Sequence, residues 1–393
     1  MSNNVLIAGV GMVKFTKPGK SEMYDIMGAK AVSNALADAG VDYKHVKQAY
    51  AGFVTGDTCS GQTALYHVGL TGIPVINVNN ACSSGSTALF LARQAVASGA
   101  VDVALAVGFE QMNPGALGSV YSDRTPTTVR HDAATQRNRG WQDQVPPGFQ
   151  YFGGAGAEYM EKYGVTAELF GKVSVKARSH ALRNPYALFS EPLTLEQVMQ
   201  SPPMFGPLTR LMCCPPTCGA AAALVVSADF ARKHRLQNAI ELAGMSLTTD
   251  DASSFDSGSM IEVVGAGLTR RASAQAYEQA GIGPEDADLV ELHDCFSTNE
   301  VVSYEALGLC PEGGAQKFVD DGGNTYGGLI VTNPSGGLLS KGHPLGATGL
   351  AQIAEISWHL RGAAGDRQVP GAKVGIQHNI GLGGACVVSV LKR

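Results

Sequence analysis

The stretch ALADAGVDYKHVKQAYAGFV at residues 35–54 returns in similar form at residues 276–296 as AYEQAGIGPEDADLVELHDCF. Each copy predicts the end of a helix at Ala-Gly, then a polar turn, then an apolar strand, because glycine suits the left-handed position that closes a helix. Helices and short strands that alternate along a chain are typical of α/β folds. The repeat therefore predicts two α/β units of the same kind.

The segments after the two copies also correspond. NVNNACSSGSTALFLARQAVASG (77–99) and TNPSGGLLSKGHPLGATGLAQIAEISWHLRG (332–362) each lead from an asparagine-containing stretch into a helix rich in small residues. Each is followed by a strand, VDVALAVGF (101–109) in one case and AKVGIQHNIGLGGACVVSVL (372–391) in the other. This duplication predicts two similar halves that face each other, with a site at their junction.

The duplication sets the expected domain bounds. We assign residues 1–118 and 206–236 to an N-terminal half and residues 237–393 to a C-terminal half. Residues 119–205 fit neither copy and are richer in arginine, proline and aromatic residues. We interpret them as an inserted loop domain that covers the site and shapes the substrate pocket. The alternative is a subdomain with no role in ligand binding.

Composition narrows the class of protein. The 393 residues are 45% hydrophobic and only 16% charged, which predicts much buried surface and a homo-oligomer. The net charge of −5 argues against a general nucleic-acid binder. No apolar run approaches the ~20 residues that span a bilayer. We expect no signal peptide, no peroxisomal signal in the final SVLKR, a cytoplasmic location, and eight free thiols.

The stretch VINVNNACSSGSTALFLARQAV (75–96) carries the first candidate nucleophile, Cys82. We predict that a strand ends before it and that a helix begins one or two residues after it. A helix N-terminus favours a thiolate and lowers the pKa of a cysteine. The small residues that follow leave room for a substrate at the sulfur. The alternative is a buried structural cysteine, the commonest state of a free thiol.

His343 lies in SKGHPLGATGLAQ (340–352) between a glycine and a proline, and a helix is predicted from about Gly346. A histidine in a rigid loop suits a general base for a thiol. The alternative is a histidine that caps the helix or bonds a backbone carbonyl.

The stretch ELHDCFSTNE (291–300) places His293, Asp294 and Cys295 side by side. We expect His293 and Cys295 to alternate along a strand with Asp294 on its other face, where it is structural. His293 can donate to an oxyanion, and Cys295 can act as an acid or base. A metal site is not expected here, because no second pair of ligands has metal-like spacing. The cluster CCPPTC (213–218) runs into an apolar strand and is not interpreted as a metal site either.

The glycine run in HNIGLGGACVV (378–388) leaves backbone N–H groups that can point at a developing oxyanion, although a tight turn between strands explains it equally well. Two nucleotide motifs are excluded. AGVGMVKF (8–15) has Lys14 where a dinucleotide fingerprint needs its third glycine, and no GxxxxGK[ST] is present.

Together these stretches resemble the thiolase superfamily, and within it the sterol carrier protein X type. The resemblance covers essentially the whole chain and includes GDTCSGQTALYHVGLTGIPVINVNNACSSGSTALF, ELHDCFSTNE, NPSGGLLSKGHPLGATGLAQ and QHNIGLGGA. It implies two α/β halves stacked in five layers with an inserted loop domain. It also implies thiolytic cleavage of a 3-oxoacyl-CoA, or the reverse Claisen condensation, with coenzyme A as co-substrate. We expect no tightly bound cofactor, no metal, and a homodimer or dimer of dimers.

The resemblance assigns roles to single residues. Cys82 matches the nucleophile that becomes acylated, and His343 matches the base that activates it. His343 and His293 would bind the thioester oxygen that becomes enolate-like. The Cys82 N–H and a glycine N–H, that of Gly381, would form a second oxyanion hole. Cys295 matches the acid/base cysteine of the sterol carrier protein X type.

The sequence departs from ordinary thiolases at two positions. Asn379 stands where they carry their second cysteine, and Cys386, further along, is interpreted as structural. Cys218 stands where the family usually has aspartate.

Two other functions stay open: a thiolase-like retro-aldolase acting on acyl-CoA, which need not keep the nucleophilic cysteine, and a non-catalytic acyl-CoA-binding scaffold subunit. The expected pathway is fatty-acid or sterol side-chain β-oxidation.

Overall fold

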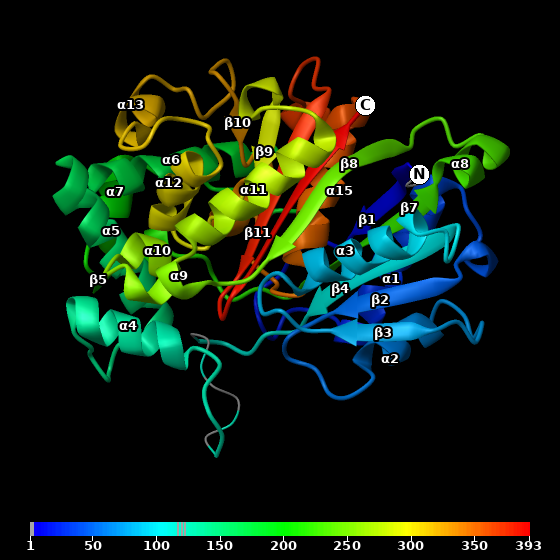
Figure 1. Cartoon of the computed structure of the whole chain (residues 1–393), viewed down its shortest axis with the longest axis horizontal. Helices are drawn as coiled ribbons and strands as arrows, with labels where there is room; N and C mark the ends of the chain where they lie inside the picture. The colour runs from blue at the N-terminus through cyan, green and yellow to red at the C-terminus, as the bar shows by residue number, and fades with distance from the viewer. Residues whose placement is uncertain (1–3, 116–117, 119–120, 122) are drawn as a thin grey trace.

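The computed structural model describes residues 4–115, 118, 121 and 123–393. In this part of the chain, ten strands form one mixed sheet in the order β10-β9-β11-β12-β8-β1-β7-β4-β2-β3 (Figure 1). Their bounds are β1 Val5–Met12, β2 Gln48–Gly52, β3 Val75–Val78, β4 Val103–Glu110, β7 Gly219–Ser227, β8 Ile240–Thr248, β9 Leu289–Glu291, β10 Val331–Thr332, β11 Val374–Gly381 and β12 Ala385–Lys392.

The sheet consists of two halves with the same topology. From the outer edge inward, one half runs β3-β2-β4-β7-β1 and the other runs β10-β9-β11-β12-β8. The pairings correspond too, since β2–β3 and β2–β4 are parallel like β9–β10 and β9–β11, and the remaining pairs in each half are antiparallel. A short antiparallel pairing of β1 with β8 joins the halves. The predicted duplicated α/β fold is confirmed.

Helices form three layers around the two halves of the sheet. Helix α1 (Tyr24–Ala39) packs on β1 and β7, and α11 (Ala266–Ala280) packs on β8 and β12. Between the halves, α3 (Ser84–Ala97) and α15 (Thr348–Arg361) contact each other and strands of both halves. The remaining helices of the halves are α2 Ser60–Tyr66, α8 Ala228–His234, α9 Ala252–Asp256, α10 Met260–Val263, α12 Ser297–Ala306, α13 Ala315–Asp320 and α14 Gly337–Ser340.

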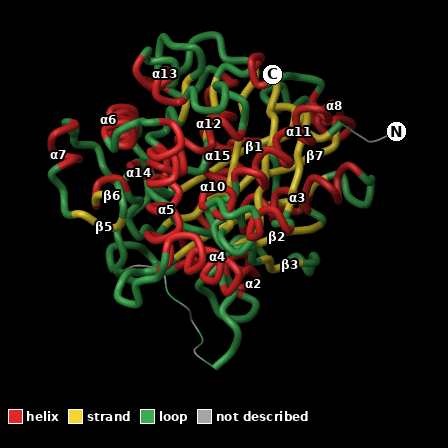
Figure 2. The backbone as a smooth tube through the Cα atoms, turned by 60° about the vertical axis from the view of Figure 1, so that its left-hand side comes forward, coloured by secondary structure: helices red, strands yellow, loops and turns green. Residues whose placement is uncertain are grey.

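The segment predicted as an insertion forms a mainly helical region beside the C-terminal half (Figures 1 and 2). It contains α4 Val129–Arg139, α5 Pro147–Tyr163, α6 Glu168–Ala181, α7 Leu195–Met199 and β5 Pro203–Phe205. Helices α5 and α6 pack on α12. Strand β5 pairs with β6 (Leu208–Thr209) across the predicted end at residue 205. Residues 1–3, 116, 117, 119, 120 and 122 of the predicted domains lie outside the described residues, and the domain bounds stay a prediction.

Glycines let the loop with His343 approach the N-terminal half closely. A Cβ atom at Gly108 in β4 would lie 2.0 Å from the carbonyl oxygen of Gly346, and one at Gly85 in α3 would lie 2.4 Å from it. A Cβ atom at Gly346 would lie 2.5 Å from the carbonyl oxygen of Gly52. These distances leave no room for a side chain, so the loop rests on bare backbone.

We predict that Gly108→Ala lowers the free energy of unfolding by ~1–3 kcal/mol, because the added methyl group overlaps backbone that must move. Urea unfolding measures this effect. Gly148→Ala in α5 is the control: its Cβ atom would lie 3.8 Å from the Phe296 ring, and alanine favours a helix over glycine. Equal midpoints for Gly108→Ala and wild type would contradict the close approach.

Candidate active site

Cys82 lies in a tight turn between β3 and α3, as the sequence predicts. Ala81 before it has φ of +48°, a left-handed conformation that is uncommon for a residue with a side chain. The amide of Ser83 donates to the carbonyl of Asn80 (3.0 Å), and the amide of Ser84 donates to that of Ala81 (3.1 Å). The turn thus places Cys82 directly before Ser83, the N-cap residue of α3, with only 8% of the Cys82 surface exposed.

The loop with His343 is held on both sides of the histidine. Before it, Gly342 has φ of +119°, and the His343 amide donates to Thr217 Oγ1 (3.1 Å). After it, the amide of Gly346 donates to the buried carboxylate of Glu110 (3.0 Å), which also accepts from the amide of Thr55 (2.8 Å). Sequence reasoning did not identify Glu110, which joins the end of β4 to this loop.

His293 follows the end of β9 instead of lying within a strand. The expected alternation along 291–295 is wrong, because β9 ends at Glu291 and the Leu292 amide donates to the side chain of Asn333 (2.8 Å) in place of a ladder bond. The Asn299 side chain donates to the His293 carbonyl, which fixes the irregular segment. His293 is 2% exposed.

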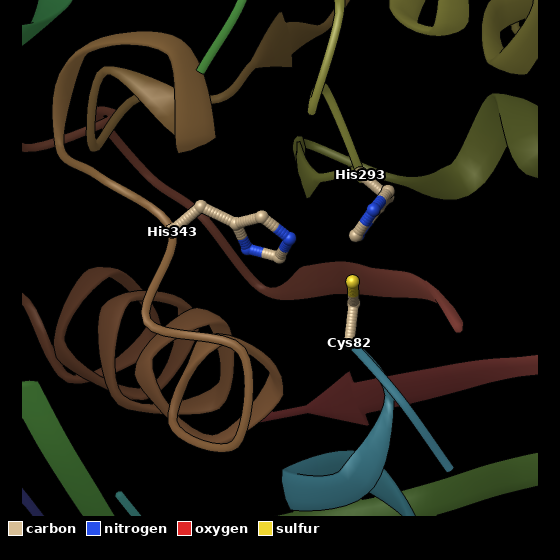
Figure 3. Close-up of side chains that lie close together, drawn as sticks. All are labelled: Cys82, His293 and His343. Carbon is tan, nitrogen blue, oxygen red and sulfur yellow. The ribbon is translucent and has the colours of Figure 1, made fainter. Parts of the chain in front are cut away.

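The fold brings Cys82 of the N-terminal half together with His293 and His343 of the C-terminal half. The sulfur and one ring nitrogen of each histidine lie within 4.8 Å of one another. The three side chains point toward one another, and the two imidazole rings are 5.1 Å apart and nearly perpendicular (Figure 3). The predicted junction site therefore contains three of the predicted catalytic side chains.

Hydrogen bonds determine which nitrogen of His343 carries the proton. Nδ1 lies 2.8 Å from Thr348 Oγ1, and that hydroxyl donates its own proton to the carbonyl of Pro344 (2.9 Å). Thr348 must therefore accept from Nδ1–H. Nε2 is left with a lone pair and, in the described part of the chain, is buried without a hydrogen-bond partner. This lone pair is the atom of His343 that is free to accept a proton or a hydrogen bond; its role as a base stays a prediction.

His293 has the opposite arrangement. Its Nδ1 lies 2.9 Å from the amide nitrogen of Asn379. An amide nitrogen only donates, so Nδ1 accepts and the ring proton sits on Nε2. His293 thus offers a hydrogen-bond donor where His343 offers a lone pair.

Burial controls the protonation of all three groups. It raises the pKa of the Cys82 thiol to about 12, against the lowering effect of a hydrogen bond from the Leu382 amide. It lowers the pKa of His343 to about 3 and that of His293 well below its usual value. The expectation of a lowered cysteine pKa is therefore wrong, because loss of solvation outweighs the helix N-terminus. The resting site holds a neutral thiol beside neutral imidazoles.

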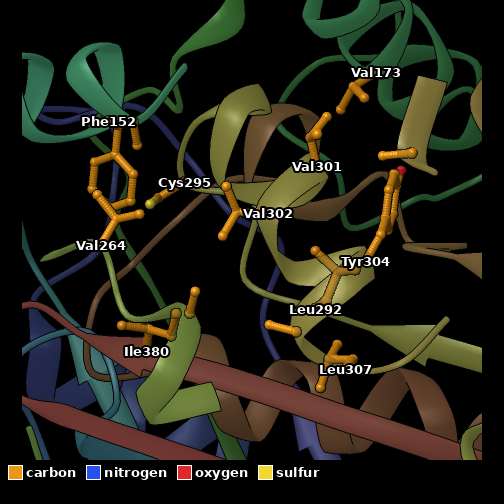
Figure 4. Packing of buried hydrophobic residues seen from close by; sticks show 14 of the residues in the cluster. Phe152, Val173, Val264, Leu292, Cys295, Val301, Val302, Tyr304, Leu307 and Ile380 are labelled. Carbon is orange, nitrogen blue, oxygen red and sulfur yellow. The ribbon is translucent and has the colours of Figure 1, made fainter. Parts of the chain in front are cut away.

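Cys295 lies outside this trio, although the thiols of Cys82 and Cys214 are close enough to act on its pKa. It belongs to a buried apolar cluster that also holds Phe152 and Val264 (Figure 4). Burial raises the pKa of Cys295 well above its usual value, and the neighbouring thiols add to this. At neutral pH Cys295 is a protonated thiol, which suits an acid. Its role stays a prediction.

Asp294 has a structural role, as the sequence indicated, but it does not lie on a strand face, because β9 ends at Glu291. Its carboxylate accepts from the amides of Leu338 (2.7 Å) and Leu339 (3.3 Å) in α14. Burial, followed by the nearby Glu300, raises its pKa to about 8. Asp294 therefore ties the segment of His293 and Cys295 to the segment that leads into His343.

The glycine run lies against the turn of Cys82. A Cβ atom at Gly381 would lie 2.0 Å from the carbonyl oxygen of Asn80, so β11 ends directly on this turn. The amide that bonds the Cys82 sulfur is that of Leu382, the next residue. The oxyanion role of the Gly381 amide stays a prediction. The amide of Leu382 is a further hydrogen-bond donor close to the Cys82 sulfur.

Three other sequence features are now placed. The Cys218 thiol is buried and donates to the carbonyl of Met112 (3.6 Å), so it packs and bonds within the core. Cys386 lies in β12 and is fully buried near Thr269. His293 presents Nε2–H rather than a lone pair to Cys82 and His343, so the trio lacks the third ligand that a metal ion would need. The absence of a metal stays a prediction.

Comparisons with known proteins find the same family in the N-terminal and the C-terminal part of the chain. Residues 5–201 match the family model "Thiolase, N-terminal domain", and residues 252–393 match "Thiolase C-terminal domain-like". A rat (Rattus norvegicus) protein named sterol carrier protein 2 is 52% identical over 392 residues, which cover 99% of this chain and 72% of that protein.

Two further relatives cover nearly the whole length. The benzoylsuccinyl-CoA thiolase subunit BbsB of Thauera aromatica is 37% identical over 98% of this chain and 96% of its own. A solved structure described as "Ltp2-ChsH2(DUF35) aldolase" superimposes with a TM-score of 0.82 at 25% identity, covering 100% of this chain and 98% of that one. In the described residues, no helix is long and apolar enough to cross a membrane.

Because the pKa of Cys82 is about 12, we predict that iodoacetamide alkylates it about tenfold faster for each unit of pH between 7 and 10, since only the thiolate reacts. Mass spectrometry of the Cys82 peptide measures the rate, with the exposed Cys59 as the internal reference. A rate that levels off below pH 8 would mean that the thiol is already ionised at rest.

Proposed function

Since this chain belongs to the thiolase family, we propose that it is a 3-oxoacyl-CoA thiolase that forms an acyl-Cys82 intermediate, with coenzyme A as co-substrate. The observation that carries the proposal is the trio itself: a thiol, an imidazole lone pair and an imidazole N–H within 4.8 Å of one another. A thiol, a base and an oxyanion donor are the three groups that acyl transfer to cysteine requires.

The first half-reaction follows from these positions. Nε2 of His343 takes the proton of the Cys82 thiol, and the sulfur attacks the 3-oxo carbon of the substrate. The bond between carbons 2 and 3 then breaks, and its electron pair moves toward the thioester oxygen of the leaving acetyl-CoA. Nε2–H of His293 stabilises that enolate-like oxygen. Cys295 donates its proton to carbon 2, which releases acetyl-CoA.

In the second half-reaction the Cys295 thiolate takes the proton of the incoming CoA thiol. The CoA sulfur attacks the acyl-Cys82 thioester, with the Leu382 amide and the proposed Gly381 amide close to the reacting centre. Cys82 leaves and recovers its proton from His343. Because neither thiol is ionised at rest, each nucleophile forms only when its base and substrate are both in place.

The test is incubation with CoA and a panel of 3-oxoacyl-CoAs of increasing chain length, including one with a sterol side chain. We predict thioester cleavage with wild type, and no acyl-enzyme by mass spectrometry with Cys82→Ser, because an alcohol without a strong base attacks poorly. Absence of thioester cleavage across the whole panel would contradict the proposed thiolase function.

For Cys295 we predict separated effects. Cys295→Ala should leave acylation of Cys82 measurable and lower turnover ~10²–10⁴-fold, since a missing acid/base costs about that much. Burst kinetics distinguish the two steps. Cys386→Ala, at a buried cysteine in β12, is the control for loss of a core thiol. Equal loss of both steps in Cys295→Ala would contradict the assigned role.

A retro-aldolase is the second candidate, because the aldolase structure covers the whole chain with a TM-score of 0.82. Retro-aldol cleavage needs no acyl-cysteine. Activity on a 3-hydroxyacyl-CoA that persists in Cys82→Ser would therefore favour the aldolase, and loss of all carbon–carbon cleavage in that variant favours the thiolase. A non-catalytic scaffold is distinguished by the absence of carbon–carbon cleavage of either substrate by the wild-type protein, together with inertness of Cys82 toward acetyl-CoA.

We also propose a homodimer that buries the free edge of β3. All four residues of β3 are partly exposed, and Tyr66 and Leu70 beside it are 58% and 80% exposed. Sedimentation velocity tests this proposal, with about twice the 40.8 kDa chain mass expected. The β-oxidation pathway, the sterol preference and the cytoplasmic location stay predictions.

A further inference from the structure

We propose that Asn379 is a positioning residue, and that a buried chain of side-chain hydrogen bonds orients it so that His293 carries its proton on Nε2. The statement about the protonation of His293 depends on the hydrogen bonds alone. The effect of that protonation on catalysis rests on the proposed function, in which Nε2–H of His293 binds the enolate-like oxygen.

The chain of hydrogen bonds begins at a group whose direction cannot be reversed. The backbone carbonyl of His378 can only accept, and it accepts from the Gln352 side-chain nitrogen (3.1 Å). The Gln352 side-chain oxygen must then face Gln377, whose nitrogen donates to it (3.0 Å). The Gln377 oxygen accepts from Ser389 Oγ (2.8 Å). Both glutamine side chains are therefore fixed in one orientation.

That orientation is passed on to Asn379 through Ser86. The Gln377 nitrogen also donates to Ser86 Oγ (3.0 Å), and Ser86 donates its proton to Asn379 Oδ1 (2.9 Å). With its oxygen occupied, Asn379 turns its amide nitrogen to His293 Nδ1 (2.9 Å). Nδ1 is an acceptor as a result, and the ring proton must sit on Nε2.

The surroundings make this arrangement costly to change. Ser86, Gln377 and Asn379 are fully buried, so a reversed amide would place two acceptors or two donors against each other without water. Gly349 in α15 provides the space: a Cβ atom there would lie 1.9 Å from Ser86 Oγ and 2.8 Å from Asn379 Oδ1. The glycine is therefore required for the contact between α3 and β11.

The chain of hydrogen bonds gives two neighbouring histidines opposite chemistry. Thr348 accepts from His343 and leaves a lone pair on Nε2, whereas Asn379 donates to His293 and leaves N–H on Nε2. Asn379 stands where the resemblance to ordinary thiolases places their second cysteine. In this chain the position is occupied by a group that orients the donor.

The direct test is NMR of the whole protein labelled with ¹⁵N-histidine, in which one-bond and long-range couplings identify the protonated nitrogen of each ring. His293→Gln and His343→Gln variants assign the signals. The expected result is Nε2–H for His293 and Nδ1–H for His343 in the wild type. The same tautomer in both rings, or Nδ1–H in His293, would overturn the proposal.

This result is independent of thiolase activity. If the two tautomers are as stated and no 3-oxoacyl-CoA is cleaved, the positioning role of Asn379 stands and the proposed function falls. If cleavage occurs and His293 carries Nδ1–H, the positioning role falls and the proposed function stands.

Asn379→Asp tests the consequence. A carboxylate only accepts, so His293 Nδ1 must carry the proton and the neutral ring presents a lone pair on Nε2. We expect kcat to fall ~10²–10³-fold, as for loss of an oxyanion donor, with KM changed little. Zn²⁺ should inhibit this variant at least about tenfold more tightly than wild type, because Cys82 and both Nε2 atoms can then bind it. A folded variant with wild-type kcat and Zn²⁺ sensitivity would overturn the role.

Ser86→Ala covers the case in which Asn379→Asp does not fold. Loss of the hydroxyl frees the Asn379 amide to rotate, so kcat should fall about tenfold or more and the His293 NMR signals should report both tautomers. Ser357→Ala is the matched control, since it removes a fully buried helix hydroxyl that has no hydrogen-bond partner among the described residues. Equal kcat in the two variants, with a single His293 tautomer in Ser86→Ala, would contradict the proposal.

Discussion

The close approach of the loop around His343 to α3 and β4 is the constraint on which the rest of the structure depends. Neither half of the chain contains a site by itself, since Cys82 comes from one half and both histidines come from the other. The halves meet where Gly85, Gly108 and Gly346 leave backbone against backbone. The duplicated topology places the two central helices, α3 and α15, between the halves. The glycines then allow the backbone of one half to contact the backbone of the other.

Burial at the junction of the two halves determines the electrostatics of the site. It keeps the Cys82 thiol and both imidazoles neutral. In such surroundings the direction of a single hydrogen bond decides whether a ring nitrogen acts as a base or as a donor. Thr348 and Asn379 therefore decide which ring nitrogen of His343 and of His293 carries the proton.

The fold could be predicted from the sequence because the repeated elements depend on local interactions. The Ala-Gly helix ends, the apolar strands and the turn at Cys82 depend on neighbouring residues, and the structure has them where they were predicted. The irregular segment after β9 was not predicted, because Asn333 reaches it from 41 residues away. The pKa of Cys82 was predicted in the wrong direction, because the sequence showed the helix N-terminus but not the loss of solvent.

The hydrogen-bond chain to His293 could not be predicted from the sequence, for a further reason. Its members come from α3, β11, β12 and α15, and each is an ordinary small polar residue when considered alone. A partial signal was present, since Asn379 and Cys295 depart together from the ordinary thiolase pattern. A cysteine moved to the segment after β9 leaves the end of β11 free for an amide, and an amide can fix the protonation of His293 where a thiol, a weak hydrogen-bonding group, would hold it poorly. In the proposed mechanism these two features belong together: Cys295 would supply the acid/base from the apolar side of the site, and Asn379 would orient the oxyanion donor His293.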